Sequence, residues 1–244
     1  MFAWRERLTD PADRPVVELA VTDRYGGVGQ APYDELNLAD HVGDREQVVR
    51  DNRARLAAAI GLDADRVVFM RQVHGRSVAL VEQGWAGSAP EADAMVTRVP
   101  GLALAVLVAD CTPVLLADPQ AGVLGVAHAG RRGLAAGVVD ALVEVMRAQG
   151  AREIIGRVGP SICGRCYEVP LAMREEVAAV APEARAMTAH GTPALDVGAG
   201  VMAQLAPHCD ELAWLPGCSA ERADLFSHRR DGATGRYAGL AWLA

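Results

Sequence analysis

The chain has 244 residues, of which 51% are hydrophobic, so it is long enough to bury a large core within one domain. All 24 basic residues are arginine, which excludes catalysis through a lysine Schiff base and a Walker-type phosphate loop. The net charge is −7 and there is no basic tract, so nucleic acid is a poor partner and a small molecule is expected.

The first half of the chain is predicted to contain strands and one helix. β-Branched residues predict a strand over residues 16–22, and an ordered loop over 31–38 follows a glycine-rich turn. Apolar residues at helical spacing predict an amphipathic helix over 44–60, with Asp44 as its cap and Gly61 at its end. Further strands are predicted at residues 67–70, 77–81, 102–109, 114–117 and 123–127.

The second half has the strongest helical pattern, over residues 134–147. An apolar segment over 154–158 precedes two further predicted helices, at 171–180 and near 196–206, the second of them following Asp196. Neither a Pro/Gly-rich linker nor a change in composition divides the chain. The sequence therefore predicts a single domain of the α+β class with mixed sheets.

The cellular compartment is inferred from two features. The longest apolar run, residues 102–109, is expected to be a strand buried on both faces, and it is shorter than the roughly 20 residues that a membrane-spanning helix needs. The first residues lack the apolar core of a signal peptide, and the five cysteines are scattered. We expect a cytoplasmic protein without a disulfide framework.

Three reactive side chains lie where predicted strands end, next to glycine or proline. They are His74 in Gln-Val-His-Gly, Cys111 in Ala-Asp-Cys-Thr-Pro and His128 in Ala-His-Ala-Gly. Two imidazoles and a thiol suit zinc, whose catalytic sites often combine three protein ligands with one open position for water. Their wide separation in the sequence also fits a half-buried histidine and an inert core cysteine, so the residues alone leave both interpretations open.

Seven short motifs, in order along nearly the whole chain, resemble the YfiH-type family, also called the polyphenol oxidase or laccase-domain family. Its members are described as purine nucleoside phosphorylases. The motifs lie at residues 32–38, 72–74, 109–113, 128–133, 159–162, 166–169 and 226–236.

The resemblance implies a four-layer α-β-β-α sandwich and a metal site whose ligands and catalytic residues are His74, Cys111 and His128. Zinc is the expected ion and copper is the alternative. The implied activities are phosphorolysis of adenosine, inosine, guanosine and methylthioadenosine, and deamination of adenosine. A purine nucleoside and phosphate are therefore the expected small-molecule partners.

Two residues are candidates for substrate binding. The Arg132 guanidinium matches phosphate geometry, and its alternative role is a loop or interface salt bridge. Asn37 is a candidate to bind ribose or base, and its alternative role is to stabilise a turn. The family usually has Trp where this chain has Arg131, so the wall near the base is expected to differ.

Other polar residues have more than one interpretation. Asp110 either tunes the metal or has a structural role, which strand alternation favours. The tail arginines, Arg229, Arg230 and Arg236, either reach an anion or pair with acids. Cys163 and Cys166 are spaced as a redox couple or half of a zinc site, but Cys209 and Cys218 lie far away in sequence, so ordinary packing is expected.

Three alternative functions stay open. Cys111 with a histidine base would suit a cysteine-dependent amidohydrolase that edits peptidoglycan precursors. A copper-dependent phenol oxidase would need more histidines than the six present, and the other four are expected to lie in unrelated places: His41, His190, His208 and His228. The third alternative is a non-catalytic metal-binding module.

Overall fold

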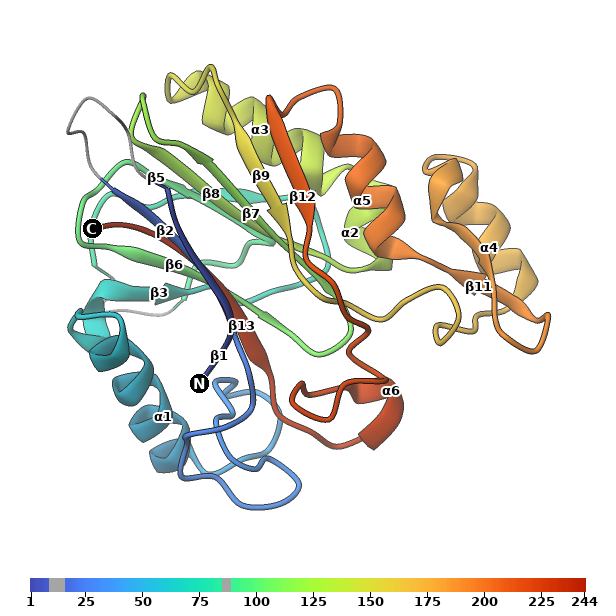
Figure 1. Cartoon of the computed structure of the whole chain (residues 1–244), viewed down its shortest axis with the longest axis horizontal. Coiled ribbons are helices and arrows are strands. Elements are labelled where there is room, and N and C mark those ends of the chain that lie inside the picture. Colours follow the sequence, from blue (N-terminus) through green and yellow to red (C-terminus); the bar gives the residue numbers. More distant parts are fainter. Residues whose placement is uncertain (9–15, 85–88) are drawn as a thin grey trace.

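The computed structural model describes residues 1–8, 16–84 and 89–244, which form two large β-sheets with helices outside them (Figure 1). The first sheet has the strand order β1 (Phe2–Leu8), β2 (Val17–Thr22), β13 (Tyr237–Leu243), β6 (Ala103–Val108) and β3 (Val67–Phe69). The second has the order β12 (Glu211–Trp214), β9 (Ile155–Val158), β7 (Thr112–Asp118), β8 (Val123–Ala129), β5 (Ala94–Thr97) and β4 (Val78–Leu80). Each sheet contains parallel and antiparallel pairs, which confirms the α+β class with mixed sheets.

A two-stranded ribbon and several helices complete the described fold. The ribbon is formed by β10 (Arg185–Met187) and β11 (Pro193–Leu195). The helices are α1 (Glu46–Ala59), α2 (Arg131–Ala136), α3 (Val138–Ala148), α4 (Leu171–Ala178), α5 (Val197–Leu205) and α6 (His228–Asp231), with 3₁₀ turns η1 (Ala64–Arg66) and η2 (Pro182–Ala184). None of the helices in the described residues is long and apolar enough to cross a bilayer.

The residues of β6 show how one strand serves two cores. Leu104 and Val106 pack toward the second sheet, whereas Ala103 and Ala105 pack toward α1. Because successive side chains point to opposite faces, an uninterrupted apolar run is the pattern expected of a strand covered on both sides. All six residues of β6 are buried, so the prediction of a strand buried on both faces is confirmed.

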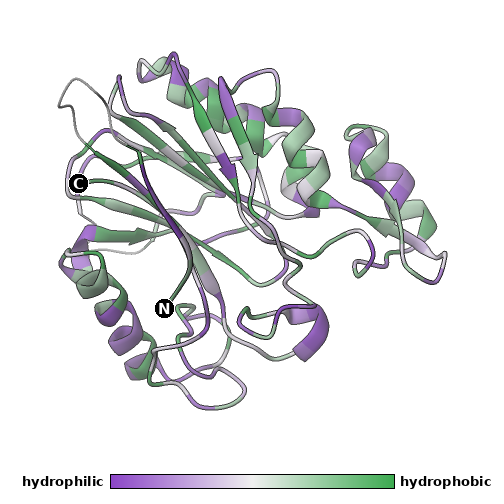
Figure 2. Ribbon diagram, in the orientation of Figure 1, coloured by the Kyte–Doolittle hydropathy of each residue, from purple (hydrophilic) through white to green (hydrophobic). Residues whose placement is uncertain are grey.

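Three hydrophobic clusters lie one after another through the molecule. One packs α1 on the outer face of the first sheet, a second lies between the sheets, and a third packs α3 and α5 on the second sheet. The order of contacts is therefore helix, sheet, sheet, helix, with α1 on one side and α3 and α5 on the other (Figure 1). The strands are mostly hydrophobic, whereas the short α6 is hydrophilic (Figure 2).

Two predicted helices differ in the structure. Helix α1 begins after Arg45 without a side-chain cap, and Asp44 instead accepts a hydrogen bond from the Asn37 side chain (3.0 Å), so the predicted cap was wrong. The single helix expected over 134–147 is two helices, because Gly137 adopts a left-handed conformation (φ 82°) between α2 and α3. Glycine is the residue that takes this conformation without strain. The Asp196 cap of α5 is confirmed, since its carboxylate accepts from the Ala199 amide.

Candidate metal centre

Two of the three predicted ligand residues lie where the chain passes between the sheets, and the third lies near the end of a neighbouring strand. His74 is in the connection from β3 to β4, and Cys111 is in the connection from β6 to β7. His128 is inside β8, the neighbour of β7, one residue before its end. The structure brings one nitrogen from each histidine and the Cys111 sulfur within 4.8 Å of one another, and the two imidazole rings meet edge to face at 4.7 Å.

A buried carboxylate, Asp93, organises two of these residues, and sequence reasoning missed it. Its Oδ1 lies 2.9 Å from His128 Nδ1 and accepts the His74 amide at 2.9 Å. Its Oδ2 accepts the amides of Val73 (3.2 Å) and Gly75 (2.6 Å). The side chain is fully buried. The sequence offered one signal for this role, an acidic residue directly before the apolar strand β5. A carboxylate at such a position is buried only if it finds hydrogen-bond partners of this kind.

The backbone around the cluster is held in unusual conformations. His74 has φ 61° and Asp110 has φ 93°, values that non-glycine residues rarely adopt. The three amides that bind Asp93 hold the His74 turn. Asp110 turns away from the cluster and accepts hydrogen bonds from Ser219 and Ser227 (both 2.7 Å) and from the Arg229 amide (2.6 Å). Asp110 therefore has the structural contacts that strand alternation favoured.

The electrostatics of the metal-free cluster favour an ion pair. Burial disfavours the Cys111 thiolate, but the neighbouring His128 and His74 stabilise it, and the pKa of Cys111 is lowered to about 6. Burial likewise disfavours charged His128, but Cys111 and Asp93 favour it, and its pKa is raised to about 9. The cluster therefore holds a thiolate beside an imidazolium, and a cation that replaces the imidazolium proton has an anionic sulfur to bind.

Two cavities meet at Cys111. One has a volume of about 210 Å³ and is lined by Cys111, Gly130, Arg131, Tyr167 and Arg229, among others. The other has a volume of about 320 Å³ and is lined by the ligand cluster with His41, Gln72, His228 and Arg236. The expectation that His41 and His228 lie in unrelated places was therefore wrong, because the fold brings both loops to the site.

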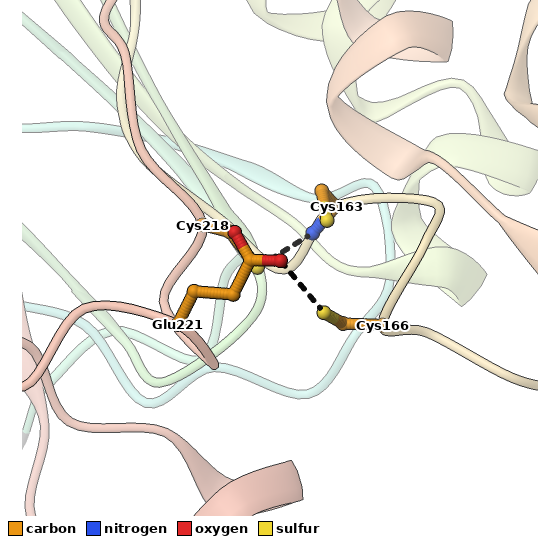
Figure 3. A group of neighbouring side chains, drawn as sticks. All are labelled: Cys163, Cys166, Cys218 and Glu221. Carbon is orange, nitrogen blue, oxygen red and sulfur yellow. Dashed lines mark hydrogen bonds between the residues drawn. The ribbon is translucent and has the colours of Figure 1, made fainter. Parts of the chain in front are cut away.

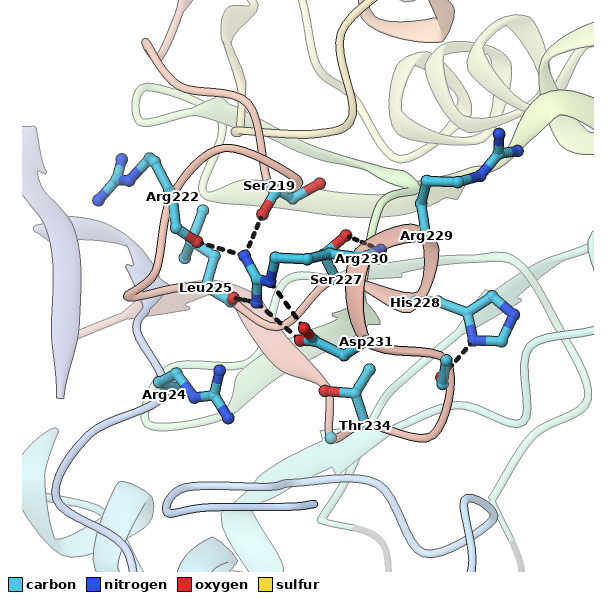
Figure 4. A network of polar contacts seen from close by, with 12 residues as sticks. Arg24, Ser219, Arg222, Leu225, Ser227, His228, Arg229, Arg230, Asp231 and Thr234 are labelled. Atoms are coloured by element: carbon cyan, nitrogen blue, oxygen red, sulfur yellow. Dashed lines mark hydrogen bonds and ion pairs between the residues drawn. The ribbon is translucent and has the colours of Figure 1, made fainter. Parts of the chain in front are cut away.

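The tail loop places His228 at both cavities and Arg229 at the smaller one. Arg230 holds this loop together, since its guanidinium pairs with Asp231 and donates to the carbonyls of Ser219, Arg222 and Leu225 (Figure 4). Figure 4 also shows that the side chains of His228 and Arg229 extend away from this network. Arg230 is thus a structural residue, as the pairing alternative expected, and its neighbours line the site.

Arg236 is a cation of the tail whose side-chain hydrogen bonds, within the described residues, go only to backbone carbonyls. It is half-buried and lines the larger cavity. Its Nη1 donates to the carbonyls of Thr234 and Gly235 (2.9 Å each), and it forms no ion pair with an acid in the described part of the chain. A guanidinium in this position is free to bind an anion in the cavity.

The two predicted substrate-binding residues have other contacts in the structure. Asn37 is fully buried, and its amide binds Ala39, Asp44 and the Arg236 backbone. These are the contacts of the turn-stabilising alternative. Arg132 is exposed and donates to the Val73 carbonyl (3.3 Å), so it supports the His74 loop from outside. Arg131, its neighbour, lines the smaller cavity instead.

These features define a mixed α+β protein with a candidate His-Cys-His metal centre at the junction of two sheets. The chain belongs to the family described as multi-copper polyphenol oxidoreductase laccase, whose model matches residues 18–244. The resemblance to the YfiH-type family is thereby confirmed.

Several relatives of this chain are named purine nucleoside phosphorylase. A purine nucleoside phosphorylase of Streptomyces griseus is 56% identical over 229 residues, which are 92% of this chain and 93% of that protein. One of Mycobacterium tuberculosis is 49% identical over 230 residues, which are 93% of this chain and 92% of that protein. The crystal structure of the hypothetical protein YfiH from Bacillus licheniformis has a TM-score of 0.86 and 28% identity, covering 96% of this chain and 98% of that one.

The residues present do not fit a multi-copper centre. Two groups of three or more possible metal ligands occur in residues 1–8, 16–84 and 89–244, and only the group at His74 contains histidine. Multi-copper chemistry needs several histidine-rich sites close together. The donor set fits one ion that accepts nitrogen and sulfur.

Proposed function

We propose that the protein is a zinc-dependent purine nucleoside phosphorylase whose metal ligands are His74, Cys111 and His128. The convergence of these three side chains at the meeting point of two cavities is the observation that carries the proposal. Relatives named purine nucleoside phosphorylase that match nearly the full chain support the choice of substrate. Copper on the same ligands is the alternative ion.

The donor set fits zinc on chemical grounds. The contact between His128 Nδ1 and Asp93 leaves Nε2 of His128 for a metal, and a carboxylate behind a histidine ligand is a common support in zinc sites. Two nitrogens and one sulfur leave one of four tetrahedral positions for a substrate or water. A bound zinc ion would supply a positive charge that attracts phosphate oxygens and lowers the cost of anionic groups nearby.

In phosphorolysis a phosphate oxygen forms a bond to C1′ of ribose while the bond from C1′ to the purine nitrogen breaks. The protein must therefore hold an anion on one side of the sugar and a leaving base on the other. We assign phosphate binding to Arg236 in the larger cavity. Tyr167 and Arg131 in the smaller cavity provide an aromatic face and a cation beside the base.

Arg132 and Asn37 have smaller parts in this proposal. Arg132 would reach phosphate only by giving up its hydrogen bond to Val73, so we assign it to supporting the His74 loop. Asn37 positions Arg236 through the hydrogen bond from the Arg236 amide to its side-chain oxygen (3.0 Å). Both residues would then affect phosphate binding through a neighbour.

The experiment is a phosphate-dependence assay on protein purified without a metal-affinity tag. Adenosine with phosphate should yield adenine and ribose 1-phosphate, and omission of phosphate should stop the reaction. His74→Ala and Cys111→Ala should each reduce the rate at least about 100-fold, because each removes a ligand. His190→Ala, at an exposed turn outside both cavities, is the matched control and should keep the wild-type rate.

Adenosine deamination is the second activity that the resemblance implies, and the same assay separates it. Deamination replaces the C6 amino group with oxygen from water, releases ammonia and yields inosine without phosphate. Inosine as the main product would assign the site to deamination. Absence of turnover of any nucleoside, in protein that contains zinc at the cluster, would contradict both activities.

A cysteine-dependent amidohydrolase is the second candidate function, because Cys111, His128 and Asp93 lie in the order of nucleophile, base and orienting acid. This function needs no metal. Chelated protein that cleaves an amide in a peptidoglycan precursor, while zinc inhibits it, would favour the hydrolase. Activity that disappears with the metal and returns with zinc would exclude it.

A further inference from the structure

A second group of possible metal ligands lies outside the site described above. Cys163 and Cys166 are in the loop after β9, and Cys218 and Glu221 are in the loop after β12. The three sulfurs and a carboxylate oxygen all lie within 4.8 Å of one another. Figure 3 shows the four side chains gathered at one place from two loops. The interpretation that set Cys218 too far away to join the pair was therefore wrong.

The fold explains why these loops meet. Strands β9 and β12 are parallel neighbours, so the segments that follow them leave the sheet at the same end. An isolated parallel bridge between Ser161 and Cys218 pairs the two segments again a few residues beyond the strand ends, and the Ser219 amide donates to the Ser161 carbonyl (3.1 Å). Strand pairing thus brings Cys163 and Cys218 close together in space although they are far apart in the sequence.

The local geometry is that of a metal-binding turn. The amides of Cys166 and Tyr167 both donate to the Cys163 carbonyl at 3.0 Å, which brings the two cysteines of Cys-Gly-Arg-Cys to one side of the turn. The Cys163 amide donates to the Cys218 sulfur at 3.3 Å, a contact that favours a thiolate. Cys166 Sγ lies 3.5 Å from Glu221 Oε1. Zinc bonds of about 2.3 Å to sulfur and about 2.0 Å to oxygen give a tetrahedral edge of about 3.5 Å.

The chemistry of the four donors selects the kind of ion. Three soft sulfurs exclude calcium and magnesium, which take oxygen ligands, and they suit zinc. Without a cation the thiols keep their protons, because three thiolates and a carboxylate this close would repel one another, and a zinc ion would replace those protons. Arg165 lies 3.2 Å from Glu221 and adds a positive charge at the edge of the group, which offsets part of the excess negative charge of a zinc complex.

We propose that Cys163, Cys166, Cys218 and Glu221 form a second, structural zinc site. On binding, the three thiols lose their protons to solvent as three zinc–sulfur bonds and one zinc–oxygen bond form. Four protein ligands close the coordination shell, which distinguishes this site from a catalytic one with an open position. The proposal does not depend on the proposed nucleoside activity.

The second site would act on the first through the loops that it joins. Ile162 and Tyr167 flank the Cys163–Cys166 turn, and both line the cavity beside Cys111. Ser219 follows Cys218 and donates to Asp110, the residue before Cys111. A zinc ion here would therefore fix one wall of the substrate cavity without contacting the substrate, and its loss would loosen that wall.

The test is a count of metal ions per chain in tag-free protein supplied with zinc and then freed of loosely bound ions. We expect about two zinc ions in the wild type and about one in Cys166→Ser and Cys218→Ser. Cys111→Ala should also retain about one, because it loses only the ion at the first site. Cys209→Ser, a partly buried cysteine outside both groups, is the matched control and should retain both ions.

A second measurement covers the case in which a cysteine variant does not fold. Crystals of the wild type, measured on both sides of the zinc absorption edge, should give an anomalous peak between the three sulfurs and Glu221. The proposal is overturned if zinc-supplied wild type has no such peak, or if Cys166→Ser and wild type contain the same number of zinc ions. An intact mass lower by two hydrogens, with a Cys163–Cys166 disulfide and no metal there, would also overturn it.

Discussion

Replacement of Asp93 by asparagine is the sharpest test of how the metal centre is built. The carboxylate accepts hydrogen bonds from three consecutive amides and contacts His128, with two of these four groups on each oxygen. Asparagine has one oxygen, so either orientation of its amide turns a nitrogen toward two groups that the carboxylate served. Asp93→Asn changes little in volume and therefore isolates the loss of the carboxylate.

The magnitude follows from the number of hydrogen bonds. Loss of two bonds to a buried charged group, each worth about 1.5–3 kcal/mol, predicts a fall of about 3–6 kcal/mol in the unfolding free energy of the metal-free protein. If the asparagine nitrogen faces His128, it favours the tautomer with the proton on Nε2, the atom left for the metal. We expect zinc affinity to fall by about 10–100-fold, as for other supporting carboxylates.

The assay combines chemical denaturation in the presence of a chelator with zinc titration against a competing chelator. Asp118→Asn is the matched control, because Asp118 is also buried and accepts three backbone amides, but at the far end of β7. It should lose comparable stability and keep wild-type zinc affinity. Asp93→Asn that binds zinc within about threefold of the wild type would refute the reasoning.

Two further predictions concern the surroundings of the cluster. Gly130→Ala would place a methyl group 2.9 Å from His74 Cδ2 and 3.1 Å from the Cys111 sulfur. We therefore expect zinc affinity to fall at least about 10-fold. Unchanged affinity in the same chelator competition would contradict this packing. Gln72→Leu would remove two hydrogen bonds with the Leu107 backbone (2.7 and 2.8 Å). The unfolding free energy measured in urea should therefore fall by about 2–4 kcal/mol. A loss below about 1 kcal/mol would contradict the role of Gln72 in holding the Leu107 backbone.

Parts of the fold were predictable because local patterns decide them. The uninterrupted apolar run of β6 and the helical spacing of α1 both correspond to elements of the structure. Strands β1 and β13 were missed, since β1 mixes charged and aromatic residues and β13 follows a polar loop. Their pairing with β2 decides their conformation, and pairing between distant segments has no local signal. The break at Gly137 was hidden because apolar periodicity continues across it.

The candidate site shows the same division between local and distant signals. Short motifs pointed to His74, Cys111 and His128, and the structure brings their side chains together. The role of Asp93 was not predicted because its partners lie in other strands and loops, and a lone acid between alanines gives no sign of them. Cys218 joins Cys163 through the parallel pairing of β9 with β12, which sequence spacing does not reveal.

The most direct test of the central claim is detection of ribose 1-phosphate from inosine and phosphate by the zinc-loaded protein. The account predicts stoichiometric ribose 1-phosphate and hypoxanthine, formed only with phosphate, and no detectable product from Cys111→Ala. Hypoxanthine with free ribose, or ribose 1-phosphate that Cys111→Ala forms at the wild-type rate, would contradict it.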